Sequence, residues 1–461
     1  MSRLARGPVS LTDGPITKSV VLFALPILVS NLVQQLYNSV DAAVVGQYAG
    51  SASLAAVGST GHLIHLLIGF FLGISTGTGV LFAMHYGARN YPKLKQLIDS
   101  SLVISVIAGI FITVIGIVFC RPLLILMNSP EDVLPLSTIY LQIYFTGNIA
   151  NLIYNVGAGI IRAEGDSTRP LIYLIISGVT NLVLDLLLVA VFEMGVAGAA
   201  IATVAAQVLS AILVIIRLMR MNPEYRLRLL QIHPDKVTVM EVIRIALPCG
   251  LQSSMFNISN LLVQAKINSF GTVAMAGITA YNKIDAFGYT SVHALGLATS
   301  TFVGQNVGAQ KYRRLQKGIR VCMGITIAVS VTVGVLVILF CKPLLNLFTT
   351  DPEAQAVGIR MMWHIIPFSW LLCFMDVLGG SIRGAGQATA VTIISALCVC
   401  VFRILWLLIM LPIFNEIRIV FCCYPISWGL NALVTTIFYY KGSILRKKIK
   451  AELAAESVAS T

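Results

Sequence analysis

Long apolar segments run through this chain of 461 residues and restrict what it can fold into. Twelve of them are each long enough to cross a hydrocarbon core of about 30 Å as a helix. Backbone polar groups find no partners in lipid, so such segments span it as helices. Hydrophobic residues make up 57% of the chain and charged residues only 11%, whereas about one quarter of a soluble domain is charged. The sequence predicts an all-α integral membrane protein with twelve transmembrane helices.

Short polar loops separate the expected spans. The segment before the first span lacks the apolar region and small-residue cleavage site of a secretory signal, so we expect the first helix to be retained. The expected spans cover residues 18–46, 54–82, 97–119, 135–160, 170–192, 195–218, 239–268, 277–305, 318–340, 356–381, 389–412 and 418–440.

The net charge of +13 follows from where the basic residues lie. With the N-terminus inside, most of the 32 Lys and Arg residues fall on the cytoplasmic side, as the positive-inside rule requires. We therefore expect both termini in the cytoplasm and the chain in the cell inner membrane, with the lipid bilayer as a partner. Basic and aromatic residues are not interleaved on a soluble domain, so nucleic acid is not an expected partner.

Short motifs recur at a constant offset and indicate an internal duplication. "FCRPLL" at Phe119 returns as "FCKPLL" at Phe340, and "IRAEGDST" at Ile161 returns as "IRGAGQAT" at Ile382, both at an offset of 221. Each copy holds six spans, so both enter the membrane from the same side as a parallel repeat. The expected architecture is two six-helix bundles related by a pseudo-twofold axis along the membrane normal. We assign residues 1–219 to an N-lobe, 220–238 to a cytoplasmic linker, 239–440 to a C-lobe and 441–461 to a basic cytoplasmic tail.

Polar residues at one depth of the N-lobe are candidates for an ion site. Asp41 aligns with Val263 and Asp185 with Trp406, so these acids belong to the first copy alone. At 1.5 Å per residue, Asp41, Asp185 and Thr203 lie roughly 8 to 12 Å below the outer surface. Asn181 precedes Asp185 by one helical turn. Ionisable residues within a membrane normally serve an ion or proton path, although an interhelical hydrogen-bond brace is the alternative.

A polar stripe follows one face of the first span. Gln34 and Asn38 belong to it, and Asn148 and Asn151 of the fourth span are further candidates for lining a substrate cavity. Pro26 opens the first span and is the candidate for a helix bend.

Charged residues within the C-lobe spans suggest an ion pair. Asp376 on span ten and Arg403 on span eleven could neutralise each other. A structural pairing is favoured over substrate binding.

Several stretches together resemble the MATE family of multidrug and toxic compound extrusion transporters. They are "LPILVSNLVQQLYNSVDAAVVGQ" in span one, "NLVLDLLLV" in span five and the following "GVAGAAIATVAAQ", in a twelve-span parallel duplication. The resemblance covers essentially the whole chain and is closest to the bacterial branch with acids on helices one and five. It implies two six-helix lobes and export of organic, often cationic, compounds in exchange for Na+ or H+.

The resemblance also implies residue roles. The N-lobe ion site would comprise Asp41, Asn181, Asp185 and Thr203, with Tyr37 beside it, and Pro26 matches the proline where helix one bends. Phe256 stands near the place of a C-lobe glutamate found in another branch, so a C-lobe ion site is not expected.

We therefore predict a secondary active multidrug antiporter that works by alternating access. No Walker A sequence occurs, and no nucleophile and base are arranged for catalysis, so neither ATP drive nor enzyme activity is expected. The predicted partners are small organic substrates, and the protein is expected to function as a monomer. No cofactor is expected other than the coupling ion, Na+ or H+, and no metal beyond possible Na+ at Asp41 and Asp185. A flippase for lipid-linked saccharides and a non-transporting receptor are the alternatives.

Overall fold

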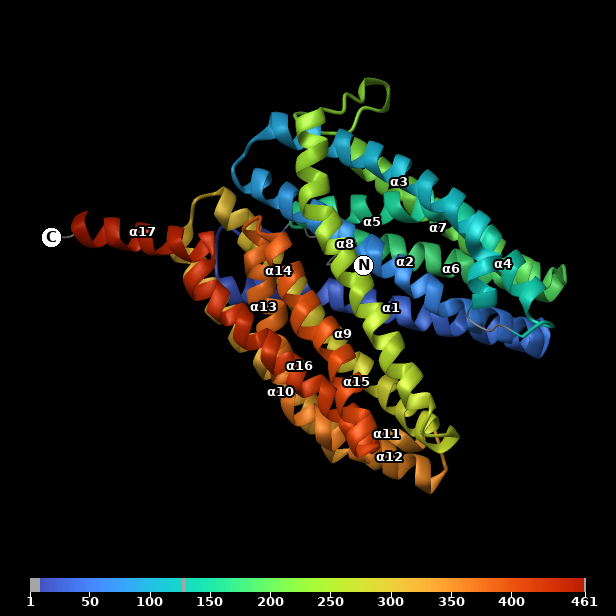
Figure 1. The fold of residues 1–461 in the computed structure, drawn as a ribbon. Coiled ribbons are helices and arrows are strands. Elements are labelled where there is room, and N and C mark those ends of the chain that lie inside the picture. Colours follow the sequence, from blue (N-terminus) through green and yellow to red (C-terminus); the bar gives the residue numbers. More distant parts are fainter. Residues whose placement is uncertain (1–8, 127–129, 460–461) are drawn as a thin grey trace. The chain divides into compact units, whose positions relative to one another are not determined.

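A computed structural model describes residues 9–126 and 130–459, apart from the side chains at 38, 42, 51, 62, 453 and 455–459. Helices account for nearly all of this part of the chain, and it contains no strand (Figure 1). The predicted all-α class is therefore confirmed.

The chain packs into two compact units. Unit 1 contains Val29–Tyr86 and Asn90–Gly250, and unit 2 contains Val9–Leu28, Gly87–Arg89 and the chain from Leu251 onward. Two long helices are divided between the units, close to the prolines Pro26 and Pro248 that each contains. The packing units thus differ from the predicted lobes, because each predicted lobe contains the whole first helix of its repeat.

Unit 1 holds most of the first sequence copy and the linker that follows it. Its elements are the later part of α1 (Ile16–Tyr48), α2 (Gly50–Gly87), α3 (Tyr91–Leu126), α4 (Leu134–Thr146), α5 (Asn148–Ala163), α6 (Thr168–Asp185), the π-helical η1 (Leu186–Val191), α7 (Gly195–Met219), the 3-10 turn η2 (Leu229–Gln231) and the start of α8 (Lys236–Asn268).

Unit 2 holds the remaining helices and the start of α1. Its further elements are α9 (Thr272–Gly308), α10 (Tyr312–Leu339), α11 (Cys341–Asn346), α12 (Pro352–Ile365), η3 (Ile366–Phe368), α13 (Trp370–Gly384), α14 (Ala388–Ser395), η4 (Ala396–Val401), α15 (Phe402–Phe414), α16 (Ile417–Ile437), η5 (Phe438–Gly442) and α17 (Ile444–Ala459). The predicted basic tail therefore includes a helix, α17.

Every predicted span coincides with one helix or a run of consecutive helical segments, except that span 170–192 ends one residue beyond η1. By length and composition alone, eight described helices could cross a membrane, or nine if α12 to α13, bent by 48°, count as one span. The number is below twelve partly because α4 and α5 are separated at Gly147 and are short individually.

The start of the chain is tied to unit 2 by hydrogen bonds. Arg314 of α10 donates from Nη1 to the Gly14 carbonyl at 2.7 Å, and Lys311 Nζ lies 2.7 Å from Asp13 Oδ1. Asn306 Nδ2 of α9 also donates to the Leu11 carbonyl at 3.1 Å. These contacts explain why the beginning of α1 belongs to unit 2, whereas its end belongs to unit 1.

The duplication is visible in how two helix pairs cross. A Cβ at Gly159 of α5 would lie 2.6 Å from the Ser75 carbonyl oxygen of α2. At the equivalent place in unit 2, a Cβ at Gly380 of α13 would lie 2.8 Å from the Gly296 carbonyl oxygen of α9. Both pairs are related by the offset of 221, and small residues allow such close approach between membrane helices. Each copy therefore builds the same crossing.

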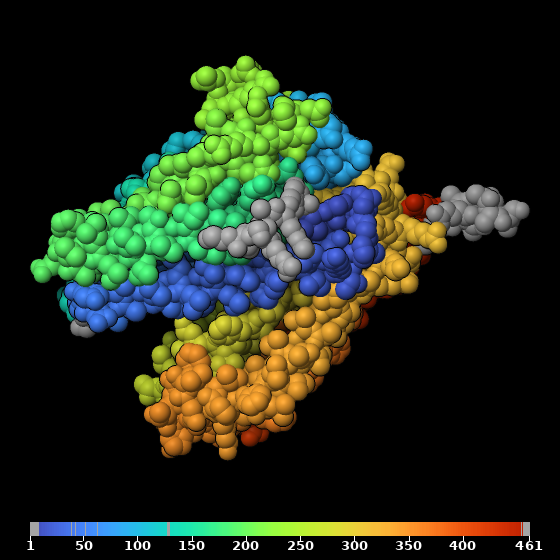
Figure 2. All heavy atoms as spheres, turned by 180° about the vertical axis from the view of Figure 1, so that it is seen from behind, coloured from blue at the N-terminus to red at the C-terminus, as the bar shows by residue number. Residues whose placement is uncertain are grey.

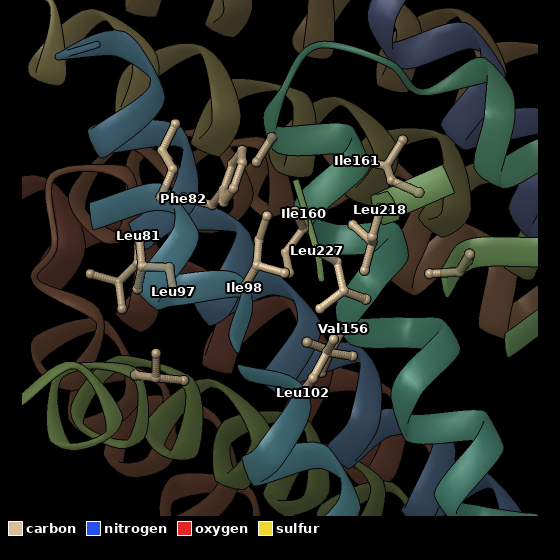
Figure 3. Packing of buried hydrophobic residues seen from close by; sticks show 14 of the residues in the cluster. Leu81, Phe82, Leu97, Ile98, Leu102, Val156, Ile160, Ile161, Leu218 and Leu227 are labelled. Carbon is tan, nitrogen blue, oxygen red and sulfur yellow. The ribbon is translucent and has the colours of Figure 1, made fainter. Parts of the chain in front are cut away.

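One hydrophobic core of unit 1 joins α2, α3, α5 and α7 to the linker. Figure 3 shows Leu227 of the linker among side chains of those helices. Met221 and Tyr225 of the linker are also buried in this cluster. The linker is thus packed against unit 1 over part of its length.

Candidate functional site

Three helices of unit 1 bring the predicted ion-site residues together. Tyr37 and Asp41 come from α1, Asn181 and Asp185 from α6, and Thr203 from α7. Asp185 is 0% exposed and Asp41 is 9% exposed. The one-turn spacing within α1 and within α6 directs both side chains of each helix to the same side.

Gly178 of α6 lies beside Tyr37 of α1. A Cβ at Gly178 would lie 3.5 Å from Tyr37 Cδ2, in ordinary contact. Figure 2 shows the later part of α1, in blue, beside the green helices of unit 1.

Asn181 lies at the centre of the pocket. In the amide orientation that satisfies both of its ends, Nδ2 donates to Asp185 Oδ2 at 2.9 Å. Its oxygen accepts from the Tyr37 hydroxyl and from the Thr203 backbone N–H, both at 3.2 Å. The Thr203 hydroxyl donates to the Ala199 carbonyl at 3.0 Å. The amide therefore fixes the orientation of Asp185 and links all three helices.

The carboxyl groups of Asp41 and Asp185 lie close enough to interact with each other. Asp41 Oδ1 and Asp185 Oδ1 are buried, and neither accepts a hydrogen bond from a described donor. A hydrogen bond between two carboxyl groups needs a proton, because ionised carboxylates are acceptors only. Chemically, the pocket offers oxygen ligands and negative charge, which suit a proton or a small hard cation.

The described residues contain no group of three or more His, Cys, Asp or Glu side chains that could hold a metal ion. A transition-metal site of that kind is therefore not found in this part of the chain. The carboxyl oxygens of Asp41 and Asp185 are hard donors, whereas the Asn181 amide faces Asp185 through its N–H group.

Two tyrosines of α4 were missed by the sequence analysis. Tyr140 and Tyr144 are both 3% exposed, and their rings stack with centroids 6.3 Å apart. Tyr140 packs in one buried cluster with Val44 and Val45 of α1 and Val189 of η1, each within four residues of Asp41 or Asp185. The four-residue spacing of the two tyrosines in span four is the sequence signal, but it resembles ordinary aromatic packing on one helix face.

The substrate-cavity candidates fall into different environments. Gln34 is partly exposed on α1, whereas the side chain of Asn38 lies outside the described residues. Asn151 is buried, and its Oδ1 accepts from Asn155 Nδ2 at 2.6 Å. Asn148 is completely buried, and neither end of its amide has a partner among the described residues. Of the three described side chains, Gln34 is therefore the one with accessible surface for a solute.

The predicted ion pair between Asp376 and Arg403 is wrong for this structure. Asp376 Oδ1 instead lies 3.3 Å from His293 Nδ1 of α9, and no ion pair joins Asp376 to Arg403 within the described chain. The cause is the close crossing of α9 and α13, where a Cβ at Gly296 would lie 2.8 Å from Asp376 Cβ. This crossing holds Asp376 against α9, while Arg403 of α15 contacts α8 and α16.

Comparisons with known proteins agree with this architecture. The MatE family model matches residues 26–187 and 248–409, one match in each sequence copy. The chain is 28% identical over 387 residues to the "Probable multidrug resistance protein YoeA" of Bacillus subtilis (strain 168), covering 82% of this chain and 83% of the relative. It is also 28% identical over 396 residues to the "Probable multidrug resistance protein YpnP" of the same organism, covering 85% and 88%.

A solved structure shares the fold. The "Crystal structure of MATE in the bent conformation" superposes with a TM-score of 0.88 at 23% identity, covering 98% of this chain and 99% of that chain. The twelve-helix, two-bundle fold predicted from the duplication is thus confirmed. Because the family model matches more than half of the chain, the protein belongs to the MatE family, which contains multidrug efflux transporters.

Proposed function

We propose that this protein is a secondary active antiporter that exports organic compounds while Na+ or H+ flows inward. It would work as a monomer in the cell inner membrane, with both termini in the cytoplasm and no cofactor other than the coupling ion. The names of its relatives as multidrug resistance proteins support the class of cargo. The pocket of Asp41 and Asp185 supports coupling to a cation.

One observation carries the assignment of the ion site. Two buried carboxyl groups face each other, and one oxygen of each accepts no hydrogen bond from a described donor. Burying carboxylates without a compensating positive charge is strongly unfavourable. A proton or Na+ bound between them would supply that charge, so the pocket should be occupied by one or the other at all times.

Coupling requires that ion and cargo favour different arrangements of the transporter. An effector shifts such an equilibrium only by its difference in affinity for the two states. Helix α1 carries Asp41 in unit 1 and begins in unit 2, so it is the element through which ion binding would influence both units. Pro26 removes one backbone hydrogen bond within α1 and weakens the helix near this division.

Transport in reconstituted vesicles tests the proposal. Ethidium transport by purified protein in proteoliposomes would be measured under a Na+ gradient alone, under a pH gradient alone, and without a gradient. We expect ethidium movement under at least one gradient and none without a gradient. The Asp41→Asn and Asp185→Asn variants should abolish it, since each removes charge while preserving shape.

The exposed Asp132→Asn provides a matched control, because it also removes one carboxylate from unit 1. It should transport like the unmodified protein. Normal transport by either pocket variant would contradict the ion-site assignment for that residue. Absence of ethidium transport under both gradients would favour the alternatives, a lipid-linked saccharide flippase or a receptor.

A further inference from the structure

Unit 2 contains a counterpart of the acid pocket with the opposite charge. The N-lobe pocket is formed by α1, α6 and α7, and their repeat counterparts are α8, α15 and α16. At the offset of 221, Tyr424 stands at the position of Thr203, and Arg403 follows the position of Asn181 by one residue. Where the first copy buries two acids, the second copy therefore buries a guanidinium.

Neutral groups from two neighbouring helices hold this guanidinium. Arg403 Nε donates to Ser427 Oγ of α16 at 2.9 Å, and Nη1 donates to Asn260 Oδ1 of α8 at 3.0 Å. The guanidinium carbon lies 4.4 Å from the centroid of the Tyr424 ring. Ser427 is itself fixed, because its hydroxyl donates to the Tyr424 carbonyl at 2.8 Å. The fork is therefore held in one orientation.

No carboxylate neutralises Arg403 within the described chain. Arg403 is 3% exposed, and none of the ion pairs formed by described residues includes it. The nearby acids have other neighbours, since Asp376 pairs with His293 and Asp285 lies next to Tyr281. Arginine cannot lose its proton in a protein, so burial must be compensated by an opposite charge.

We infer that the Arg403 pocket binds a carboxylate or another oxyanion group of the exported solute. This inference rests on the proposed export function and specifies part of its substrate class. A guanidinium fork matches the two oxygens of a carboxylate and binds them through parallel hydrogen bonds. Asn260, which holds Arg403 Nη1, is exposed, so one partner of the guanidinium is accessible from outside the protein.

The depth of Arg403 in the membrane favours a solute, rather than a lipid headgroup, as the source of the anion. The span from Ala388 to Phe414 places Arg403 about 22 Å from one end and about 16 Å from the other at 1.5 Å per residue. Arg403 therefore lies within a hydrocarbon core of about 30 Å, below the level of the lipid phosphates. The anion must enter through a polar path, as a transported solute does.

Two dyes that differ in one group test the inference. Rhodamine 110 carries a free carboxylate, and rhodamine 123 is its methyl ester with the same ring system. Binding of each dye to the purified full-length protein would be followed by fluorescence anisotropy. We expect Arg403→Gln to weaken rhodamine 110 binding by about ten-fold or more and rhodamine 123 binding by less than about two-fold.

The Asn260→Asp variant keeps the inference testable even if the Arg403→Gln protein misfolds. It places a carboxylate beside Arg403, where it competes with the dye carboxylate, so it should also weaken rhodamine 110 binding selectively. A structural role alone predicts no such selectivity, because the guanidinium would keep its hydrogen-bonding neighbour. Arg418→Gln is the matched control, since Arg418 is an exposed arginine of α16. It should change neither dye.

Three results would overturn the inference. The first is equal rhodamine 110 binding by the unmodified protein and by its Arg403→Gln and Asn260→Asp variants. The second is an equal loss of both dyes in those variants, which indicates a structural brace. The third is displacement of bound rhodamine 110 by phosphatidylglycerol, which assigns the pocket to lipid. Gradient-driven transport of rhodamine 123 tests the export function separately, because that dye lacks the carboxylate.

Discussion

The hydroxyl of Tyr225 donates a hydrogen bond of 2.9 Å to Glu164 Oε1, while Arg217 Nη2 binds Glu164 Oε2 at 2.7 Å. Tyr225 is 2% exposed and belongs to the linker, whereas Glu164 follows α5. Ala385 occupies the position of Glu164 in the second copy. The acid is thus specific to the first copy, where it anchors the linker to unit 1.

We expect Tyr225→Phe to lower the free energy of unfolding by about 1–3 kcal/mol. The substitution keeps the ring in the core and leaves one buried Glu164 oxygen without its donor. Thermal and denaturant unfolding of the purified protein would measure the change. Tyr48→Phe, at a tyrosine that is 51% exposed, is the control and should have little effect. Equal stabilities of the two variants would mean that the Glu164 bond contributes nothing measurable.

Alkaline pH should weaken the same anchor. Burial and, next, the Glu164 carboxylate raise the pKa of Tyr225 well above its ordinary value. A raised pKa favours the protonated phenol in the folded state, so its contribution is fully present below about pH 10 and is lost as pH rises further. We expect the unmodified protein to lose more thermal stability than Tyr225→Phe between about pH 9 and 11. Parallel losses in the two proteins would contradict this linkage.

Protons and Na+ should compete at the acid pair if Na+ binds there. One proton held between Asp41 and Asp185 must leave before a cation takes its place, so acidification weakens Na+ affinity by up to about ten-fold per pH unit. Isothermal titration at several pH values would measure this slope. Asp185→Asn should remove most of it. An affinity that stays constant from mildly acidic to alkaline pH would rule out a shared site and leave Asp185 as a brace.

Gly380→Ala should destabilise unit 2. Its Cβ would lie 2.8 Å from the Gly296 carbonyl oxygen, so α9 and α13 would have to move apart, at a cost of about 1–3 kcal/mol. The unfolding midpoint in denaturant reports the change. Gly324→Ala of α10 is the control, because nothing lies within 4 Å of its Cβ and alanine favours a helix. A Gly380→Ala protein as stable as Gly324→Ala would contradict the close crossing.

The effects of Asp376→Asn and Arg403→Gln on stability should add. The two residues have separate partners, His293 for the acid and Ser427 with Asn260 for the base. Changes at sites that share no partner usually add within about 0.5 kcal/mol. Unfolding of both single variants and the double variant completes the cycle. A double variant markedly more stable than the sum of the two single effects predicts would support the ion pair expected from the sequence.

The sequence by itself determined the helical class, the spans and the parallel duplication. These properties depend on hydropathy and on repeated motifs, which are local in the chain. The grouping of Asp41 with Asp185 was also predictable, because the rise per residue places both at one depth and only the first copy carries them. In the structure the two carboxyl groups lie close enough to interact.

Only the tertiary structure decided which helix faces meet. Depth along two spans placed Asp376 and Arg403 as possible partners, but the rotation of each helix directs one toward α9 and the other toward α8 and α16. The same holds for Tyr140, whose position near the acid pair depends on how α4 packs. Helix rotation and crossing are set by side-chain packing between distant segments, and neither hydropathy nor spacing within one span contains that information.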